Sequence, residues 1–124
     1  MVDSPGHLFL HCGLSNELNA TALEQLTALQ RREWKRSVVR PRQGSATDRL
    51  WQPEYPVWIG ADKGLSKSPL PFPGKVQVTG HVTVPNPDVN PVRIRLDTSG
   101  GFGELVACVL RAADAGPEFV SSRP

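Results

Sequence analysis

The sequence predicts a small, single α+β domain in which a long amphipathic N-terminal helix and a C-terminal helix pack on a short, mostly antiparallel sheet. Three observations lead to this fold class. Leucines recur at helical spacing between residues 18 and 29, apolar and polar residues alternate over 75–85 and 92–97, and a second helical pattern covers 102–113. The 124 residues suffice for one ordinary domain with a core of its own.

The first predicted unit, residues 7–39, is a strand followed by the long helix. Residues 7–12 form a short apolar run that a glycine closes, which is typical of a strand. Ser15 or Asn16 then caps a helix, which ends by about Val39 because Pro41 disfavours helical conformation in the residue before it. The buried stripe of this helix comprises Leu18, Ala22, Leu23, Leu26 and Leu29.

Residues 40–74 are rich in basic residues, proline and glycine, and they form a predicted excursion from the domain. Their one apolar cluster, 55–60, predicts a short buried strand or core anchor, and its prolines favour a sheet edge. The proline-rich stretch 66–73 favours an extended path. We interpret it as a stiff linker, and the alternative is a ligand for a proline-reading groove.

Residues 75–116 are predicted to form a β-hairpin and then a helix. The runs 75–85 and 92–97 flank a segment dense in turn formers, so they should pair as antiparallel strands, with Gly80 as a bulge. Arg93 and Arg95 alternate with apolar residues and should lie on a wet, basic face. The core-facing positions of the whole sheet are then Leu8, Leu10, Val57, Ile59, Val76, Val78, Ile94 and Leu96.

The second helix is predicted over 102–113, where apolar residues recur at offsets of three and four and 115–117 supply a stop signal. The competing interpretation is a buried strand over 105–110, because apolar residues occupy both its odd and its even positions and would cover both faces. Residues 117–124 are a predicted flexible tail. With so few regular elements the core is thin, so we expect self-association as a homo-oligomer or within a larger assembly.

Charge is distributed unevenly along the chain. Seven of the fourteen Lys and Arg residues fall within 31–49 against two acidic ones, so this segment is net +5 while the chain is only +2. Guanidinium groups bind phosphates, and an indole can stack on an unpaired base. The pattern predicts a docking segment for an acidic protein or a nucleic acid; the plainer alternative is a solvated helix end and a basic loop. The candidate contacts are Arg31, Arg32, Trp34, Lys35, Arg36, Arg40, Arg42 and Arg49.

A glycine-rich turn, residues 97–104, connects a predicted strand to a predicted helix. Backbone N–H groups at such a helix start can converge on an anion. The segment has neither the Lys-Ser/Thr pair of a P-loop nor the spacing of a dinucleotide-binding turn, so a tight capped turn is the simpler interpretation. As an anion site it would support a small phosphate- or nucleotide-binding enzyme, through Thr98, Ser99, Gly100, Gly101 and Gly103.

The histidines and cysteines give little support for a metal site. Zinc bound by His7, His11 and Cys108 is conceivable, but paired close ligands are missing, so we predict no metal and no cofactor. Cys12 beside His11 is the one sequence-adjacent nucleophile and base, and neighbours on a strand point to opposite faces. We therefore expect no catalytic residue. We also expect two reduced, buried thiols rather than a disulfide between Cys12 and Cys108.

These features favour a non-enzymatic interaction or assembly module that uses its basic segment to dock a polyanionic or acidic partner. Direct RNA or DNA binding is the strongest alternative, and a nucleotide-binding enzyme is the weakest. No run of about eighteen apolar residues occurs, and the start lacks the basic region and apolar core of a secretory signal. We expect a cytoplasmic protein that does not contact membranes.

Overall fold

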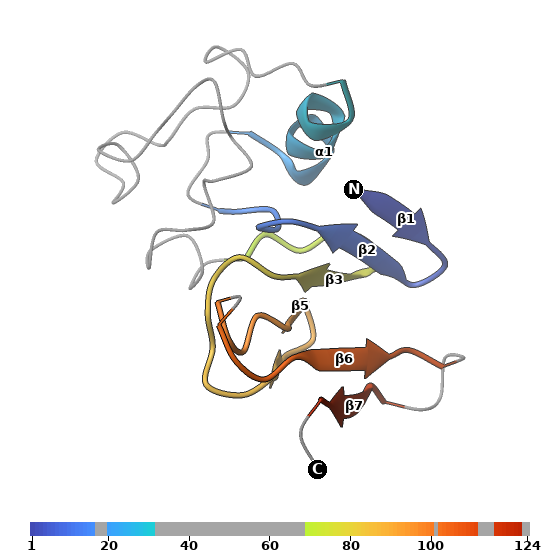
Figure 1. Cartoon of the computed structure of the whole chain (residues 1–124). Helices are drawn as coiled ribbons and strands as arrows, with labels where there is room; N and C mark the ends of the chain where they lie inside the picture. Colours follow the sequence, from blue (N-terminus) through green and yellow to red (C-terminus); the bar gives the residue numbers. More distant parts are fainter. Residues whose placement is uncertain (17–19, 32–68, 101, 112–115, 123–124) are drawn as a thin grey trace.

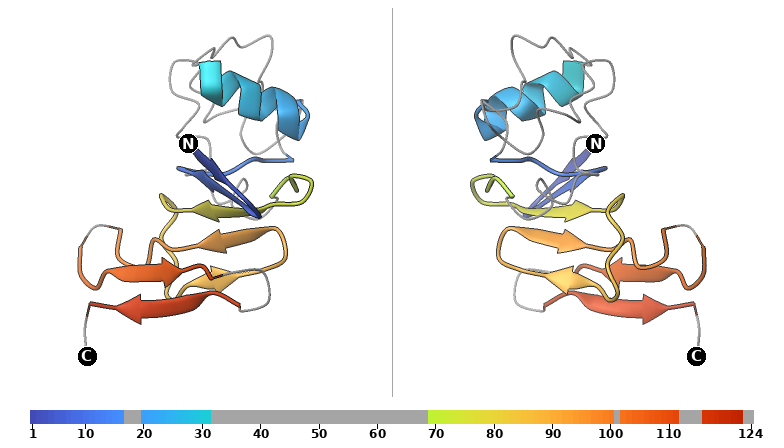
Figure 2. Two further views of the ribbon diagram at one scale, coloured as in Figure 1. Left: turned by 90° about the vertical axis from the view of Figure 1, so that its right-hand side faces the viewer. Right: turned by 90° about the vertical axis from the view of Figure 1, so that its left-hand side faces the viewer.

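The computed structural model describes residues 1–16, 20–31, 69–100, 102–111 and 116–122. A five-stranded sheet contains β1 (Val2–Ser4), β2 (His7–Leu10), β3 (Val76–Thr79), β4 (Asp88–Val89) and β5 (Arg93–Arg95). A separate hairpin contains β6 (Val106–Val109) and β7 (Glu118–Ser121), and the described helix is α1 (Ala22–Arg31). Strands dominate, so the predicted pair of helices on a sheet is wrong. Figures 1 and 2 place α1 and the β6–β7 hairpin at opposite ends of the molecule.

The N-terminal strand is confirmed, but the helix after it begins later than predicted. β2 pairs with β1 in an antiparallel hairpin. The chain then buries Leu14 and Ser15, whose backbone N–H donates to the Gln25 side chain (3.0 Å). Thr21 caps α1 instead of Ser15 or Asn16: its hydroxyl accepts the Glu24 N–H (3.3 Å), while the Glu24 carboxylate accepts the Thr21 N–H (2.8 Å). This reciprocal pair is a capping box. The predicted continuation to Val39 and the short strand at 55–60 lie outside the described residues.

The centre of the five-stranded sheet is parallel, which corrects the predicted hairpin. The order is β1-β2-β3-β5-β4, and β3 lies between β2 and β5, parallel to both. A parallel pair needs a long crossover. α1 lies in the connection from β2 to β3, and residues 80–92 connect β3 to β5. The expected turn at 86–91 instead contains β4, which pairs antiparallel with β5.

The C-terminal part of the chain is a β-hairpin. The predicted helix over 102–113 is wrong, because β6 occupies Val106–Val109. The alternative, a buried strand over 105–110, is right about the strand but wrong about its burial, since exposed and half-buried residues alternate along it. β7 lies in the predicted flexible tail and pairs with β6 from Val106↔Ser121 to Val109↔Glu118. Val and Phe favour such extended pairing, and Gly116 and Pro117 of the predicted stop signal directly precede β7.

The apolar core lies between α1 and the sheet. Leu8, Leu10, Leu14 and Leu26 form its buried cluster, and Leu70 and Phe72 pack against it. The last two belong to the proline-rich stretch, so its described end is part of the fold. Of the eight predicted core positions, Leu8, Leu10, Val78 and Ile94 are buried, Val76 and Leu96 are half-buried, and Val57 and Ile59 lie outside the described residues.

The expected wet, basic face of β5 is also wrong. Arg93 is only 2% exposed, because β5 lies within the sheet and is covered at this position by the segment after β2. Arg95 is half-buried and pairs with Asp88. No helix in the described part of the chain is long and apolar enough to cross a membrane.

Candidate metal centre

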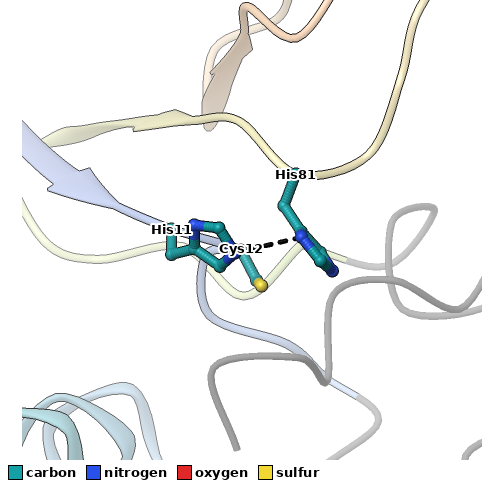
Figure 3. Close-up of side chains that lie close together, drawn as sticks. All are labelled: His11, Cys12 and His81. Carbon is teal, nitrogen blue, oxygen red and sulfur yellow. Dashed lines mark hydrogen bonds between the residues drawn. The ribbon is translucent and has the colours of Figure 1, made fainter. Parts of the chain in front are cut away.

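Three potential metal ligands meet where two parallel strands end. Leu10, the last residue of β2, pairs with Thr79, the last residue of β3, so the chain leaves both strands at one edge of the sheet. His11 and Cys12 follow β2, and His81 follows β3 after one glycine. The Gly80 N–H donates to the His11 carbonyl oxygen (3.1 Å), which holds the two segments together. Figure 3 shows the three side chains directed toward one another.

The donor atoms of this cluster are close enough to share one ion. His11 Nε2 lies 3.0 Å from His81 Nδ1, and one ligand atom from each of His11, Cys12 and His81 lies within 4.8 Å of the other two. A bound zinc ion has nitrogen ligands at about 2.0–2.1 Å and a sulfur ligand at about 2.3 Å. Small side-chain movements are therefore sufficient to bring all three donors to coordination distance.

The backbone at this edge explains why the three side chains converge. Strand alternation predicts that His11 and Cys12 point apart, but both residues lie beyond the end of β2, where the chain bends. That prediction from strand geometry therefore does not apply. His81 has φ 67°, and it is the one non-glycine residue of the described ranges with a positive φ. Such a conformation is uncommon and often marks a functional site.

The electrostatic surroundings keep His81 in its metal-binding form. Burial, followed by the nearby His11 ring, lowers the pKa of His81, while Asp97 acts in the opposite direction. The neutral imidazole that results retains a nitrogen lone pair for a metal. His11 is exposed, so its ring is accessible to an ion from solvent. It also borders an open hollow of about 490 Å³, whose lining includes neither Cys12 nor His81.

The segment after Cys12 is fixed from two neighbouring strands. The Leu14 N–H donates to Gln77 Oε1 (2.7 Å) on β3, and the Leu14 carbonyl accepts from Arg93 Nη2 (2.6 Å) on β5. Gly13 has φ +94°, and a Cβ there would lie 2.6 Å from Arg93 Nη2. A side chain at position 13 is thus excluded by both conformation and space. These contacts position the cysteine that precedes them.

The conceivable zinc set of the sequence, His7, His11 and Cys108, is not assembled. His11 alone joins the cluster, and the other two ligands are Cys12 and His81. His7 is at the start of β2 and its ring faces Phe9, while Cys108 is in β6. Cys12 and Cys108 form no disulfide, as predicted; Cys12 is buried and Cys108 is half-buried.

The predicted basic docking residues are almost entirely outside the described ranges. Arg31 is the last residue of α1, and nothing in the structure places the others, namely Arg32, Trp34, Lys35, Arg36, Arg40, Arg42 and Arg49. Arg93 and Arg95 do not extend this group on an exposed face, because one is buried and the other is paired with Asp88.

The glycine-rich turn leads into a strand, so it lacks the helix end that suggested anion binding. Gly100 N–H donates to Asp97 Oδ1 (2.7 Å) and Phe102 N–H to the Ser99 carbonyl (3.0 Å). Thr98 Oγ1 donates to the Glu104 carbonyl (3.4 Å), and Gly101 lies outside the described residues. Anion binding by Thr98, Ser99, Gly100, Gly101 and Gly103 stays a prediction.

Comparison of the chain with protein-family models, with curated proteins and with solved structures finds no match.

Proposed function

We propose that this protein binds a soft or borderline transition-metal ion through His11 Nε2, Cys12 Sγ and His81 Nδ1. The observation that carries the proposal is the convergence of these three donors from the ends of two parallel strands. Two imidazoles and a thiolate suit zinc, copper or cobalt, whereas magnesium and calcium prefer oxygen ligands. The lowered pKa of His81 and the fixed segment after Cys12 support the same assignment.

Titration with Co²⁺ tests the proposal directly. Binding through Cys12 should produce a thiolate-to-cobalt absorption band that saturates at one ion per chain. Cys12→Ser should abolish the band, and His81→Asn should weaken binding by about 100-fold or more, beyond the usual effect of losing an outer-shell contact. Cys108→Ser and His7→Asn are matched controls, because they remove the same residue types outside the cluster. A band that persists in Cys12→Ser and disappears in Cys108→Ser would contradict the assignment.

A second candidate function is docking of a polyanionic or acidic partner by the segment 31–49. Its support is the charge distribution: seven cationic residues against two acidic ones. Elsewhere, the four cationic side chains that the structure describes are all engaged. Lys75, Arg95 and Arg111 form salt bridges with acidic residues, and Arg93 is buried. Among the described residues outside this segment, no Lys or Arg side chain is therefore both exposed and without an acidic partner.

Nucleic acid is the polyanion that tests docking most simply. If about five phosphates are neutralised, the logarithm of the binding constant should fall against the logarithm of the salt concentration with a slope of about −4. The triple variant Arg32→Glu, Lys35→Glu, Arg36→Glu should abolish binding, while Lys75→Glu serves as the control outside the segment. Retention of full affinity by the triple variant would reject this segment as the contact.

A further inference from the structure

Arg93 places a positive charge inside the protein, next to the segment that carries Cys12. Its side chain is 2% exposed. Nη2 donates to the Leu14 carbonyl (2.6 Å), and the same guanidinium group lies against Gly13, where an added Cβ would be 2.6 Å from Nη2. Nε is buried and makes no hydrogen bond within the structure. The guanidinium is thus fixed beside the backbone that immediately follows Cys12.

The charge of Arg93 persists although the residue is buried. Burial, and then the charge of Arg95, lower the pKa of Arg93 to about 10, which still leaves the guanidinium protonated at neutral pH. No described carboxylate forms a salt bridge with it. The group that favours its charged form is Cys12. Buried charges are ordinarily paired, and the guanidinium contacts the backbone of Gly13 and Leu14, which directly follow Cys12.

A bound ion therefore adds its charge to a region that already holds the positive charge of Arg93. A monovalent ion adds one unit of positive charge and a divalent ion adds two, so the repulsion from the guanidinium is about twice as large for the divalent ion. Asp97 opposes this effect, since its carboxylate favours the protonated form of His81. However, Asp97 is half-exposed and accepts the Gly100 N–H, so its field is more strongly screened than that of Arg93.

We infer that Arg93 makes the His11–Cys12–His81 centre selective for cuprous copper over zinc, an inference that rests on the proposed metal site. The donor set agrees with this choice, because a thiolate with imidazoles suits the soft Cu⁺ ion. A structural zinc site usually has four protein ligands, whereas the described residues supply three donors within the cluster. Arg93 acts through charge, as a specificity-determining residue, without contacting the ion.

The ratio of Cu⁺ affinity to Zn²⁺ affinity isolates this effect. Both affinities are measured on the full chain without oxygen, by competition with a chromogenic chelator for each ion. Loss of the Cys12 proton and any change in fold stability affect both ions and cancel in the ratio. Arg93→Met removes the charge, so the ratio should fall by about tenfold or more, whereas Arg93→Lys should preserve it.

Two further variants keep the test decisive if Arg93→Met does not fold. Asp97→Asn removes the opposing charge and should raise the ratio, by less than the change expected from Arg93. Arg95→Met is the matched control on the same strand, where a half-exposed guanidinium paired with Asp88 should affect the ratio by less than about threefold. An unchanged ratio in Arg93→Met or in Asp97→Asn overturns the inference while metal binding stands. Failure of the unaltered chain to bind Cu⁺, Zn²⁺ or Co²⁺ overturns the metal site itself.

Discussion

The five-stranded sheet and the β6–β7 hairpin differ in how far their side chains are buried. In β3 three consecutive residues, Gln77, Val78 and Thr79, are buried, so both faces of the strand are covered. In β7 all four residues are exposed, and Val120 retains 51% of its accessible surface. A central parallel strand is enclosed on both faces, whereas an antiparallel hairpin can leave one face in water.

Because of this difference in burial, different interactions stabilise the sheet and the hairpin. The sheet depends on side-chain burial. Although the buried Arg93 Nε has no hydrogen-bond partner among the described residues, most polar groups that a protein encloses need such partners. Gln77 shows this: its amide accepts from the Leu14 N–H (2.7 Å) and donates to the Leu70 carbonyl (2.6 Å). The hairpin depends on its backbone ladder and on exposed contacts such as the Arg111–Glu118 pair (2.8 Å), which contribute little individually. Substitutions should therefore be costly in the sheet and mild in the hairpin.

Truncation of one leucine in each region should show the largest contrast. Leu8 is 0% exposed in the main core cluster, whereas Leu105, beside β6, is 65% exposed. Leu8→Ala should lower the free energy of unfolding by about 2–5 kcal/mol, and Leu105→Ala should change it by less than about 0.5 kcal/mol. Urea unfolding followed by circular dichroism measures both. Equal losses would mean that a partner surface, in a homo-oligomer for instance, buries Leu105.

Replacement of the buried amide should have the next largest effect. Gln77→Leu has nearly the same size but leaves the Leu14 N–H and the Leu70 carbonyl without their partner, so the free energy of unfolding should fall by about 2–4 kcal/mol. Because Leu14 follows the metal cluster by two residues, Co²⁺ affinity should also fall. Ser121→Ala in the exposed β7 is the control in the hairpin. A stabilised Gln77→Leu variant would show that the enclosed polar contacts are dispensable.

Local sequence patterns identified several elements but not their partners. The strand at 7–12 and the extended runs that contain β3 and β5 were predictable, because apolar alternation reports which residues face the core. Alternation does not report the direction of the neighbouring strand, so a turn-rich segment at 86–91 suggested a hairpin. For β6, Val106 and Val109 at helical spacing imitated a helix, although two β-branched residues and a following strand-like run, Phe119-Val120, favour pairing.

The metal cluster could not be predicted, for a related reason. Gly80 looked like a bulge that left His81 inside a strand, whereas β3 ends before it. Cys12 and His81 meet because β2 and β3 are parallel and in a particular register, and that pairing joins segments more than sixty residues apart. The one usable signal was that His11 and His81 each follow an apolar or alternating run. It becomes informative only when those runs are known to end at the same sheet edge.

The helix α1 allows a finer test, because its Leu26 packs with Leu8 and Leu10 of β2, while the hairpin lies at the opposite end of the molecule (Figures 1 and 2). Hydrogen bonds from the Thr21 side chain and backbone lower the pKa of Glu24, so the folded chain favours the charged carboxylate. The stability from this contact is present above the unfolded pKa, near 4.5, and is lost as pH falls through the folded value. Thr21→Ala should cost about 1 kcal/mol at neutral pH through loss of the cap, and the part of this cost that depends on the Glu24 carboxylate should disappear in acid. Hydrogen exchange should accelerate in the α1 amides and leave those of β6 and β7 unchanged. Equal acceleration in both regions would show that sheet and hairpin unfold as one unit.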